Sequence, residues 1–228
     1  MTHLVPAPPP DHRRVLPGFL AALGGLVLLV ASGLVARGGT VGPAERRVFH
    51  AVNDLPQWLY RPMWLFQQFG NLVVAFVLVL GVALVLRRPR LAAAAVVAVV
   101  AKLAFERAVK SMVERARPGT SIGDVVLRGD VSRDGLSFVS GHAVITTACA
   151  TMLMAVLPRR WRPLPWAIVV LNGLARIYVG AHNPLDVVGG VGLGLVIGGL
   201  LYAALVAGTP VVAHRQGTDA PSPEAHAA

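Results

Sequence analysis

Six apolar stretches, several of them long enough to cross a lipid bilayer, constrain the fold of this chain more than any other feature. They cover residues 16–35, 63–86, 91–110, 140–157, 164–179 and 185–206. A membrane-spanning helix needs roughly 20 mostly apolar residues. With 55% hydrophobic and 14% charged residues, the chain is also more apolar than an ordinary soluble domain. The sequence therefore predicts an all-α integral membrane protein, one compact bundle of six transmembrane helices.

The sequence divides into three parts. Residues 1–15 form a Pro-rich tail, residues 16–207 the six-span domain, and residues 208–228 a polar tail that we expect to be disordered. Arg13 and Arg14, which precede the first apolar stretch, resemble the start of a signal peptide, but the stretch is longer than a usual signal core. We expect an uncleaved first span, because the apolar segments then pair into an even number.

The formal net charge of +10 suggests either nucleic-acid binding or an orienting charge at a membrane. We exclude nucleic acid as a partner, because no polar domain carries a basic stripe interleaved with aromatic residues. Arginines instead crowd the ends and links of apolar stretches, at positions 13, 14, 87, 88, 90, 159, 160 and 162. Short loops rich in arginine stay in the cytoplasm. We therefore expect a multi-pass plasma-membrane protein whose opposite, extracytoplasmic face carries the functional site.

Three short polar motifs lie at the edges of the apolar stretches. They are Lys110-x6-Arg117-Pro118, Ser140-Gly141-His142 and Arg176-x5-His182-x3-Asp186. With six spans, their key residues fall on the same face of the membrane, and hydropathy alone does not impose that coincidence. Together they offer three cations, two histidines and one carboxylate, so we expect one shared site that handles phosphate.

His182 and Asp186 are four residues apart, which places them on one face of a helix. A carboxylate that accepts one imidazole N–H fixes the tautomer and leaves the other nitrogen free to attack. Asp186 also follows Pro184 in the first turn of the last stretch, so a merely helix-stabilising acid is the alternative. The pair is a candidate nucleophile with its orienting carboxylate.

His142 follows Ser140 and Gly141 at the start of the fourth stretch. A small-residue turn that enters a helix exposes backbone N–H groups, which bind phosphate oxygens. A histidine at that point can protonate a leaving group as a general acid. An N-cap serine beside a polar interfacial histidine is the alternative.

Lys110 and Arg117 are seven residues apart, two helical turns, so we expect them to project from one helix face. Arg176 is the third cation. In phosphoryl transfer, negative charge spreads over three equatorial oxygens of the transition state, and fixed cations stabilise it. Interfacial snorkelling explains other arginines, such as Arg107 and Arg115, equally well. It does not explain why Arg176 directly precedes the His182–Asp186 pair.

The three motifs together resemble the signature of the type 2 phosphatidic acid phosphatase superfamily. That pattern is Lys-x6-Arg-Pro, Pro-Ser-Gly-His and Ser-Arg-x5-His-x3-Asp, and the matching segments here read KSMVERARP, VSGH and ARIYVGAHNPLD. The resemblance covers roughly residues 60–206. It implies a membrane-bound phosphatase, without metal or cofactor, that acts on lipid phosphates or diphosphates through a phosphohistidine intermediate.

The resemblance also implies a role for each motif residue. His182 would be the nucleophile, Asp186 its orienting partner and His142 the acid and base. The phosphate would be bound by Lys110, Arg117, Ser140, Gly141 and Arg176.

Two positions depart from the family pattern. Val139 replaces a proline, and Ala175 replaces a serine whose hydroxyl could bond phosphate. Neither departure removes a group that attacks or transfers a proton, so we retain the enzyme prediction.

The favoured substrate is a polyprenyl diphosphate carrier lipid, followed by phosphatidic acid or phosphatidylglycerol phosphate. A lipid phosphotransferase, a family member weakened by the two departures, and a transporter or scramblase that needs no nucleophile stay open as alternatives. We expect no metal site, because His142, His182 and Asp186 are the available ligands and the surrounding cations would repel a metal ion.

Polar side chains inside the apolar stretches need partners. We expect Lys102 and Glu106, four residues apart, to pair. Gln67, Gln68 and Asn71 are expected to hydrogen-bond between helices, with lining of the substrate cleft as the alternative. The single cysteine, Cys149, lies in an apolar stretch and is expected to be a small packed residue.

Overall fold

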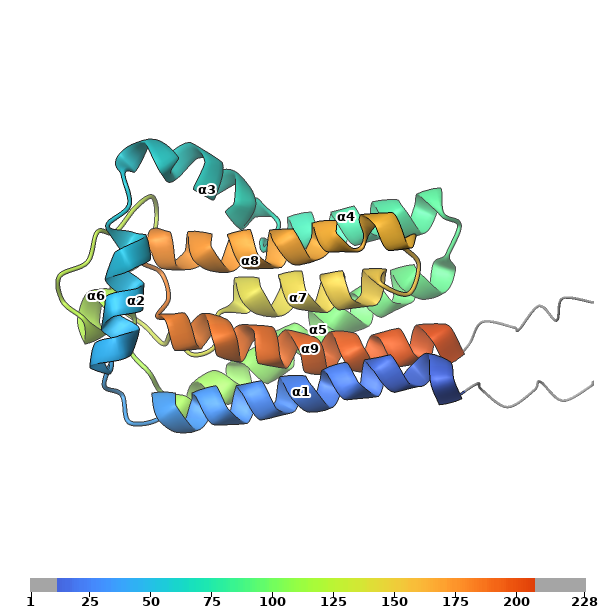
Figure 1. Cartoon of the computed structure of the whole chain (residues 1–228), viewed down its shortest axis with the longest axis horizontal. Coiled ribbons are helices and arrows are strands. Elements are labelled where there is room, and N and C mark those ends of the chain that lie inside the picture. Colours follow the sequence, from blue (N-terminus) through green and yellow to red (C-terminus); the bar gives the residue numbers. More distant parts are fainter. Residues whose placement is uncertain (1–11, 208–228) are drawn as a thin grey trace, which may run out of the picture.

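A computed structural model describes residues 12–207, and its regular elements are helices. Within that range, extended backbone pairs only in an isolated bridge between Ala116 and Leu136. The all-α prediction is therefore confirmed. Six helices run along the long axis of the molecule (Figure 1): α1 (His12–Ala36), α4 (Leu72–Val85), α5 (Pro89–Val113), α7 (Gly141–Leu153), α8 (Pro163–Tyr178) and α9 (Pro184–Ala207).

The two ends of the bundle differ in character. One end carries the short helices α2 (Pro43–Asn53), η1 (Gln57–Leu59), α3 (Tyr60–Gln68) and α6 (Pro118–Ser121). The other end carries the start of α1, the α4–α5 link and the α7–α8 link with η2 (Arg159–Trp161) (Figure 1). The arginine-rich links thus lie at one end of the bundle. The polar motifs lie at or near the other end, which we call the motif end.

Two helices, α1 and α9, are long and apolar enough to cross a membrane. The segments Gln57–Gln68 and Leu72–Val85 would together form a third span, bent by 57°. In contrast, α7 has 13 residues, roughly 20 Å of helix, which is shorter than a hydrocarbon core of about 30 Å. The chain is an integral membrane protein with two, or up to three, candidate spans by length and composition, and the prediction of six is not confirmed.

The second predicted span breaks where the chain passes close to α7 and α8. At Gly70, an added Cβ would lie 2.6 Å from Asn172 Nδ2 and 2.8 Å from His142 Cβ, so a side chain has no room there. Asn71 then caps α4, because its Oδ1 accepts hydrogen bonds from the N–H groups of Val73 (3.0 Å) and Val74 (3.3 Å). This break leaves α3 above the motif end of α8 (Figure 1).

The helix α7 lies at the centre of the bundle. Its residues from Ala143 to Met152 are all buried, and it contacts α4, α5, α8 and α9. A helix that is covered on all sides does not have to match the membrane thickness by itself. Cys149, 9% exposed, belongs to this core, so the expectation of a packed cysteine is confirmed.

The first and last long helices approach each other closely through glycines. A Cβ at Gly25 would lie 2.5 Å from the carbonyl oxygen of Gly192, and one at Gly18 would lie 2.5 Å from that of Gly199. The two pairs are seven residues apart on each helix. Small residues at this spacing let two helix backbones touch, which is how helices associate in lipid.

The end of α5 corrects one prediction. The helix stops at Val113, and Glu114 adopts a left-handed conformation with φ of 49°. Arg117 lies beyond the break in extended backbone, as the residue before α6. Lys110 and Arg117 therefore do not share a helix face, because the helix ends between them.

The predicted tails lie almost wholly outside the described residues. Residues 12–15 of the expected N-terminal tail form the first turn of α1. The expectations for residues 1–11 and 208–228 cannot be compared with the structure, which describes residues 12–207.

Candidate active site

A polar pocket of about 520 Å³ opens at the motif end of the bundle. One motif residue from each of the three polar motifs lines it: Arg117, His142 and Arg176. The remaining lining comes from α3, from the α3–α4 link and from the loop after α6, namely Tyr60, Trp64, Gln67, Gln68, Asn71, Arg128, Gly129, Asp130, Val131 and Ser132. Segments that are far apart in the sequence thus meet at one pocket, and the five other predicted site residues lie outside its lining.

Two of the three arginines that line the pocket, Arg117 and Arg176, belong to different motifs. Arg176 lies in the last turn of α8 and donates a hydrogen bond to Gln67 Oε1. Arg117 is the residue before α6, and its backbone is extended. The buried Nε atoms of both arginines have no hydrogen-bond partner among the described residues. Two guanidinium groups with spare donors can bind the oxygens of one phosphate.

The three predicted amides share the pocket, and Gln67 also makes a hydrogen bond between helices. Gln67 accepts from Arg176, while Gln67, Gln68 and Asn71 all line the pocket. The alternative of cleft lining is therefore the better description of this group.

His142 is the second residue of α7 and faces the pocket. Its backbone carbonyl accepts a hydrogen bond from the Thr146 hydroxyl at 2.7 Å. The residue is partly exposed and lines the same pocket as Arg117 and Arg176.

His182 lies on the link between α8 and α9 and is 3% exposed, so the prediction that it shares a helix face with Asp186 is wrong, because α9 begins only at Pro184. Its Nδ1 is 3.8 Å from Asp186 Oδ2, a charge contact that is too long for a hydrogen bond. Burial lowers the pKa of His182 to about 4; the charges of Arg176 and Lys110 lower it as well, whereas Asp186 raises it. The imidazole is therefore neutral near pH 7, the form in which it can attack.

Asp186 is held on both of its oxygens. Its Oδ2 accepts a hydrogen bond from the backbone N–H of Asn183 at 2.7 Å, which closes the first turn of α9. Its Oδ1 accepts one from Arg115 Nη1 at 3.0 Å. The carboxylate thus caps its helix, as the alternative predicted, and lies 3.8 Å from His182 Nδ1, so its orienting role stays a prediction.

Arg115 is a site-associated residue that the motif pattern did not single out. Its side chain is 0% exposed and binds Glu45 as well as Asp186. Burial lowers the pKa of this guanidinium, but the two carboxylates outweigh burial and raise the pKa above its usual value. The interpretation as a snorkelling arginine is wrong for Arg115, because a snorkelling side chain ends in water.

The second motif contacts the third through its backbone. The N–H of Ser140 donates to the carbonyl oxygen of Asp186 at 2.9 Å. Ser140 Oγ is buried and has no hydrogen-bond partner among residues 12–207. At Gly141 a Cβ would lie 2.5 Å from Glu106 Oε2, so a larger residue would displace this carboxylate.

Lys110 lies outside the polar pocket. Its Nζ is 2.8 Å from Glu106 Oε1, and the Nζ of Lys102 is 2.6 Å from Oε2, so the predicted pairing of Lys102 with Glu106 is confirmed. These three side chains line a neighbouring pocket of about 420 Å³. The structure thus brings Lys110 close to the histidines, but its direct partner is Glu106.

The two departures from the family pattern lie in the core. Val139 and Ala175 are both 0% exposed, and neither lines the polar pocket. Val139 packs against α9, where a Cβ at Gly189 would lie 3.0 Å from its Cγ1. A valine here fills space, and it changes no group that faces the pocket.

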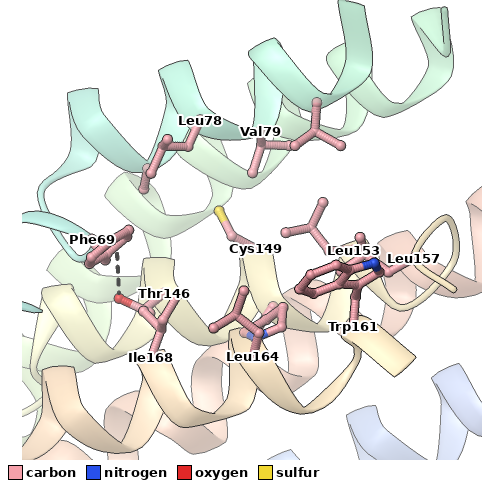
Figure 2. Close-up of a pocket in the computed structure, with 14 residues that line it drawn as sticks. Phe69, Leu78, Val79, Thr146, Cys149, Leu153, Leu157, Trp161, Leu164 and Ile168 are labelled. Carbon is pink, nitrogen blue, oxygen red and sulfur yellow. Dashed lines mark hydrogen bonds between the residues drawn. The ribbon is translucent and has the colours of Figure 1, made fainter. Parts of the chain in front are cut away.

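An apolar cavity of about 320 Å³ lies beside the polar pocket, between α4, α7 and α8. Figure 2 shows Leu78, Val79, Cys149, Leu153 and Leu164 around it. Thr146, one turn beyond His142, lines the cavity, but its hydroxyl is already bonded to the carbonyls of His142 and Phe69. The wall is therefore almost wholly hydrocarbon.

The chain is similar to a curated relative and to solved structures. Over 93 residues the chain is 36% identical to a decaprenylphosphoryl-5-phosphoribose phosphatase of Mycobacterium tuberculosis, an alignment that covers 41% of this chain and 49% of that protein. The chain thus spans about half the length of this curated relative.

Two crystal structures have a similar fold. LpxE of Aquifex aeolicus aligns with a TM-score of 0.61 at 24% identity, covering 68% of this chain and 92% of that one. A transmembrane PAP2 type phosphatidylglycerolphosphate phosphatase from Bacillus subtilis aligns with a TM-score of 0.59 at 23% identity, covering 81% and 94%. At these identities the likeness concerns the fold.

The family model described as PAP2 superfamily matches residues 90–209, more than half of the chain and all three polar motifs. The resemblance seen in the motifs is thereby confirmed: this protein belongs to the PAP2 superfamily.

Proposed function

We propose that this protein is a membrane phosphatase that hydrolyses lipid phosphates through a phosphohistidine on His182, without a metal. The observation that carries the proposal is the meeting of Arg117, His142 and Arg176 in one pocket, next to the His182–Asp186 pair. Membership of the PAP2 superfamily supports the same reaction class.

In the first step, Nε2 of His182 attacks phosphorus while the bond from phosphorus to the lipid oxygen breaks. Asp186 faces Nδ1 and stabilises the imidazolium that forms. Arg117 and Arg176 bind the equatorial oxygens, whose negative charge grows in the transition state. His142 gives its proton to the leaving lipid oxygen.

In the second step, water replaces the lipid alcohol. His142, now neutral, takes a proton from the water as its oxygen attacks phosphorus. The bond from phosphorus to His182 breaks, and inorganic phosphate leaves. Each residue returns to its starting protonation state, so the cycle needs no further reactant. Ser140, Gly141 and Lys110 complete our proposed phosphate-binding set. The Nζ of Lys110 is paired with Glu106, so Lys110 would contribute through its charge and not through a direct contact.

The apolar cavity supports a lipid as the substrate. It begins one helical turn from His142 and is lined by hydrocarbon from α4, α7 and α8. A phosphate bound in the polar pocket can therefore place its attached chain in the cavity. Burial of each CH₂ group contributes about 0.8 kcal/mol to binding.

Within the lipids, we favour a polyprenyl carrier. The relative from Mycobacterium tuberculosis is named for a decaprenyl lipid with a phosphorylated ribose, and this name supports a prenyl chain. The proposed substrate panel has four lipids: a polyprenyl diphosphate, which we favour, a polyprenyl phosphate, phosphatidic acid and phosphatidylglycerol phosphate.

We further propose that all six long helices cross or enter the plasma membrane, with the site on the extracytoplasmic side. The arginine-rich links at the opposite end of the bundle support this orientation (Figure 1). Since α7 is enclosed by its neighbours, its short length is compatible with a position inside the membrane.

Phosphate release by the purified protein in detergent tests the proposal. The four lipids would be assayed with EDTA present, and His182→Ala would be run in parallel. We expect release that survives EDTA and disappears in the variant. Transfer of the phosphoryl group to an added alcohol without release would instead indicate a phosphotransferase. Lipid movement that persists in His182→Ala would indicate a transporter.

A further inference from the structure

We propose that Glu45 and Arg115 are positioning residues: together with Asp186 they form a buried ion cluster that orients the carboxylate and sets its charge toward His182. This inference rests on the proposed function, because it assigns a part in the same reaction to residues outside the three motifs. Neither residue is a member of the family pattern, and Glu45 comes from a helix that precedes the matched region.

The cluster has close and specific geometry. Arg115 donates from Nη1 to Glu45 Oε1 at 3.0 Å and from Nη2 to Glu45 Oε2 at 2.5 Å, a two-pronged pair. The same Nη1 donates to Asp186 Oδ1 at 3.0 Å. The side chains of Arg115 and Asp186 are 0% exposed and that of Glu45 is 9% exposed. These contacts are therefore largely shielded from solvent.

The cluster determines which oxygen of Asp186 faces the histidine. Oδ1 is bound to Arg115, whereas Oδ2 lies 3.8 Å from His182 Nδ1. Without Arg115, the Asn183 N–H would be the one remaining hydrogen-bond donor to the carboxylate among residues 12–207. Glu45 is fixed from a second side, because its Oε1 also accepts the N–H of Leu185 at 2.9 Å. Both carboxylates are thus anchored to the first turn of α9, at the link that carries His182.

The charges of the cluster do not cancel. Two carboxylates face one guanidinium, which leaves one negative charge beside an imidazole that Arg176 and Lys110 otherwise surround with positive charge. A phosphorylated His182 is cationic and needs that negative charge. If Glu45 were neutral, Arg115 would compensate Asp186 alone, and the imidazolium would lose its counter-charge. Glu45 therefore matters although it does not touch His182.

The fold explains how Glu45 reaches this place. The helix α2 crosses the motif end of the bundle, near the start of α9 (Figure 1). Phe49, 0% exposed, packs with Ile122 and Ile177, and Asn53 bonds to the backbone of Val126 and Tyr178. This helix is held from several sides, so it can present Glu45 in a fixed position.

Glu45→Gln tests the charge without changing the shape. We expect kcat on lipid phosphate to fall on the order of tenfold, the rate equivalent of one pKa unit, with KM and the thermal unfolding midpoint unchanged. The acidic limb of the kcat profile should also move to lower pH, because loss of negative charge makes His182 harder to protonate. A merely structural glutamate would not move that limb.

The matched control is Glu114→Gln, the same change at an exposed acid one residue before Arg115. It should leave kcat and the pH profile at the wild-type values. If folded Glu45→Gln also keeps the wild-type kcat and pH profile, while His182→Ala is inactive, the inference is overturned and the proposed function stands. A wild-type protein that releases no phosphate would instead overturn the proposed function.

A second pair of variants covers the case in which Glu45→Gln does not fold. The double variant Glu45→Leu with Arg115→Met removes both buried ions, a replacement that folded proteins often tolerate. It leaves Asp186 charged but without its anchor on Oδ1. We expect the double variant to have a lower kcat at unchanged KM. The single variant Arg115→Lys, which keeps Glu45 and a positive charge, should have a kcat between those of the double variant and the wild-type protein. A wild-type kcat in the folded double variant would overturn the inference.

Discussion

His182 and His142 differ in their surroundings, and their proposed tasks follow from that difference. His182 is 3% exposed on the link before α9, whereas His142 faces the polar pocket. A buried imidazole resists protonation and stays available as a nucleophile. A ring at the pocket wall can exchange protons with a leaving group and then with water. The two histidines of the motifs are thus not interchangeable.

The lowered pKa of His182 sets the acidic limit of activity. Because the folded-state pKa is about 4 instead of 6.5, the imidazole stays neutral as pH falls from 7 to 5 and becomes protonated near pH 4. We therefore expect the acidic limb of kcat/KM near pH 4, once ionisation of the substrate phosphate has been measured by ³¹P NMR and factored out. A limb near pH 6.5 would mean that His182 is solvated.

The proposed acid role of His142 makes the effect of its loss depend on the leaving group. His142→Gln should lower kcat by about 10²–10⁴-fold for an alkyl phosphate lipid, whose leaving oxygen needs a proton. With an aryl phosphate, whose leaving group is a weak base, the first step should be nearly unaffected, as a phenolate burst would show. His50→Gln, a change outside the pocket, is the control. Equal losses in the first step for both substrates would contradict the role.

Some site residues could be predicted from the sequence and others could not, for a physical reason. The motif residues carry their chemistry in fixed spacings, so His182, Asp186 and His142 are recognisable without a structure. Glu45 and Arg115 meet across 70 positions, and no local pattern reports such a contact. The only signal for Arg115 is its place two residues before Arg117, which by itself fits a surface arginine equally well.

At the scale of helices, apolar stretches predicted where the long elements lie, but not where they break or end. The α3–α4 break depends on Gly70 and on the Asn71 cap, and the end of α5 depends on Glu114 in a left-handed conformation. Both are decided by contacts or single dihedral angles. For that reason the shared face of Lys110 and Arg117 was a wrong prediction, although both lie near the predicted site.

The cavity between α4, α7 and α8 should distinguish long-chain from short-chain substrates. Ala150 lines it, and Ala150→Leu would place three more carbons inside. We expect kcat/KM for a prenyl phosphate to fall on the order of tenfold, the effect of about 1.4 kcal/mol of lost chain contact, while a soluble aryl phosphate is hydrolysed at the wild-type rate. Ala104→Leu, at an exposed position of α5, is the control. Equal rates on the prenyl substrate would exclude the cavity as the chain site.

At the scale of the whole molecule, the bundle is polarised. One end carries the polar pocket and the short helices, and the other carries the arginine-rich links (Figure 1). The sequence could predict this separation, because charges and motifs alternate along the chain with the apolar stretches. The number of membrane crossings is harder to predict from the sequence. A short helix that is enclosed by other helices, such as α7, does not need the length by which spans are recognised.

Labelling of single cysteines in intact cells checks the proposed orientation. Cys149 is buried, so it adds little background. Ser132→Cys at the pocket end should react with a membrane-impermeant maleimide from outside. Arg160→Cys in the α7–α8 link should react only after the membrane is permeabilised. The reverse pattern would place the site in the cytoplasm.

The most direct measurement is a search for phosphate on His182 during turnover. Purified protein would be mixed with an aryl phosphate, quenched in alkali, which preserves a phosphohistidine, and digested for mass spectrometry. His142→Gln should accumulate the intermediate, because water is then activated poorly. We predict a phosphoryl group on His182 in this variant and none in His182→Ala. If His142→Gln carries phosphate on another residue, or on none, while the wild-type protein turns over, the proposed mechanism is contradicted.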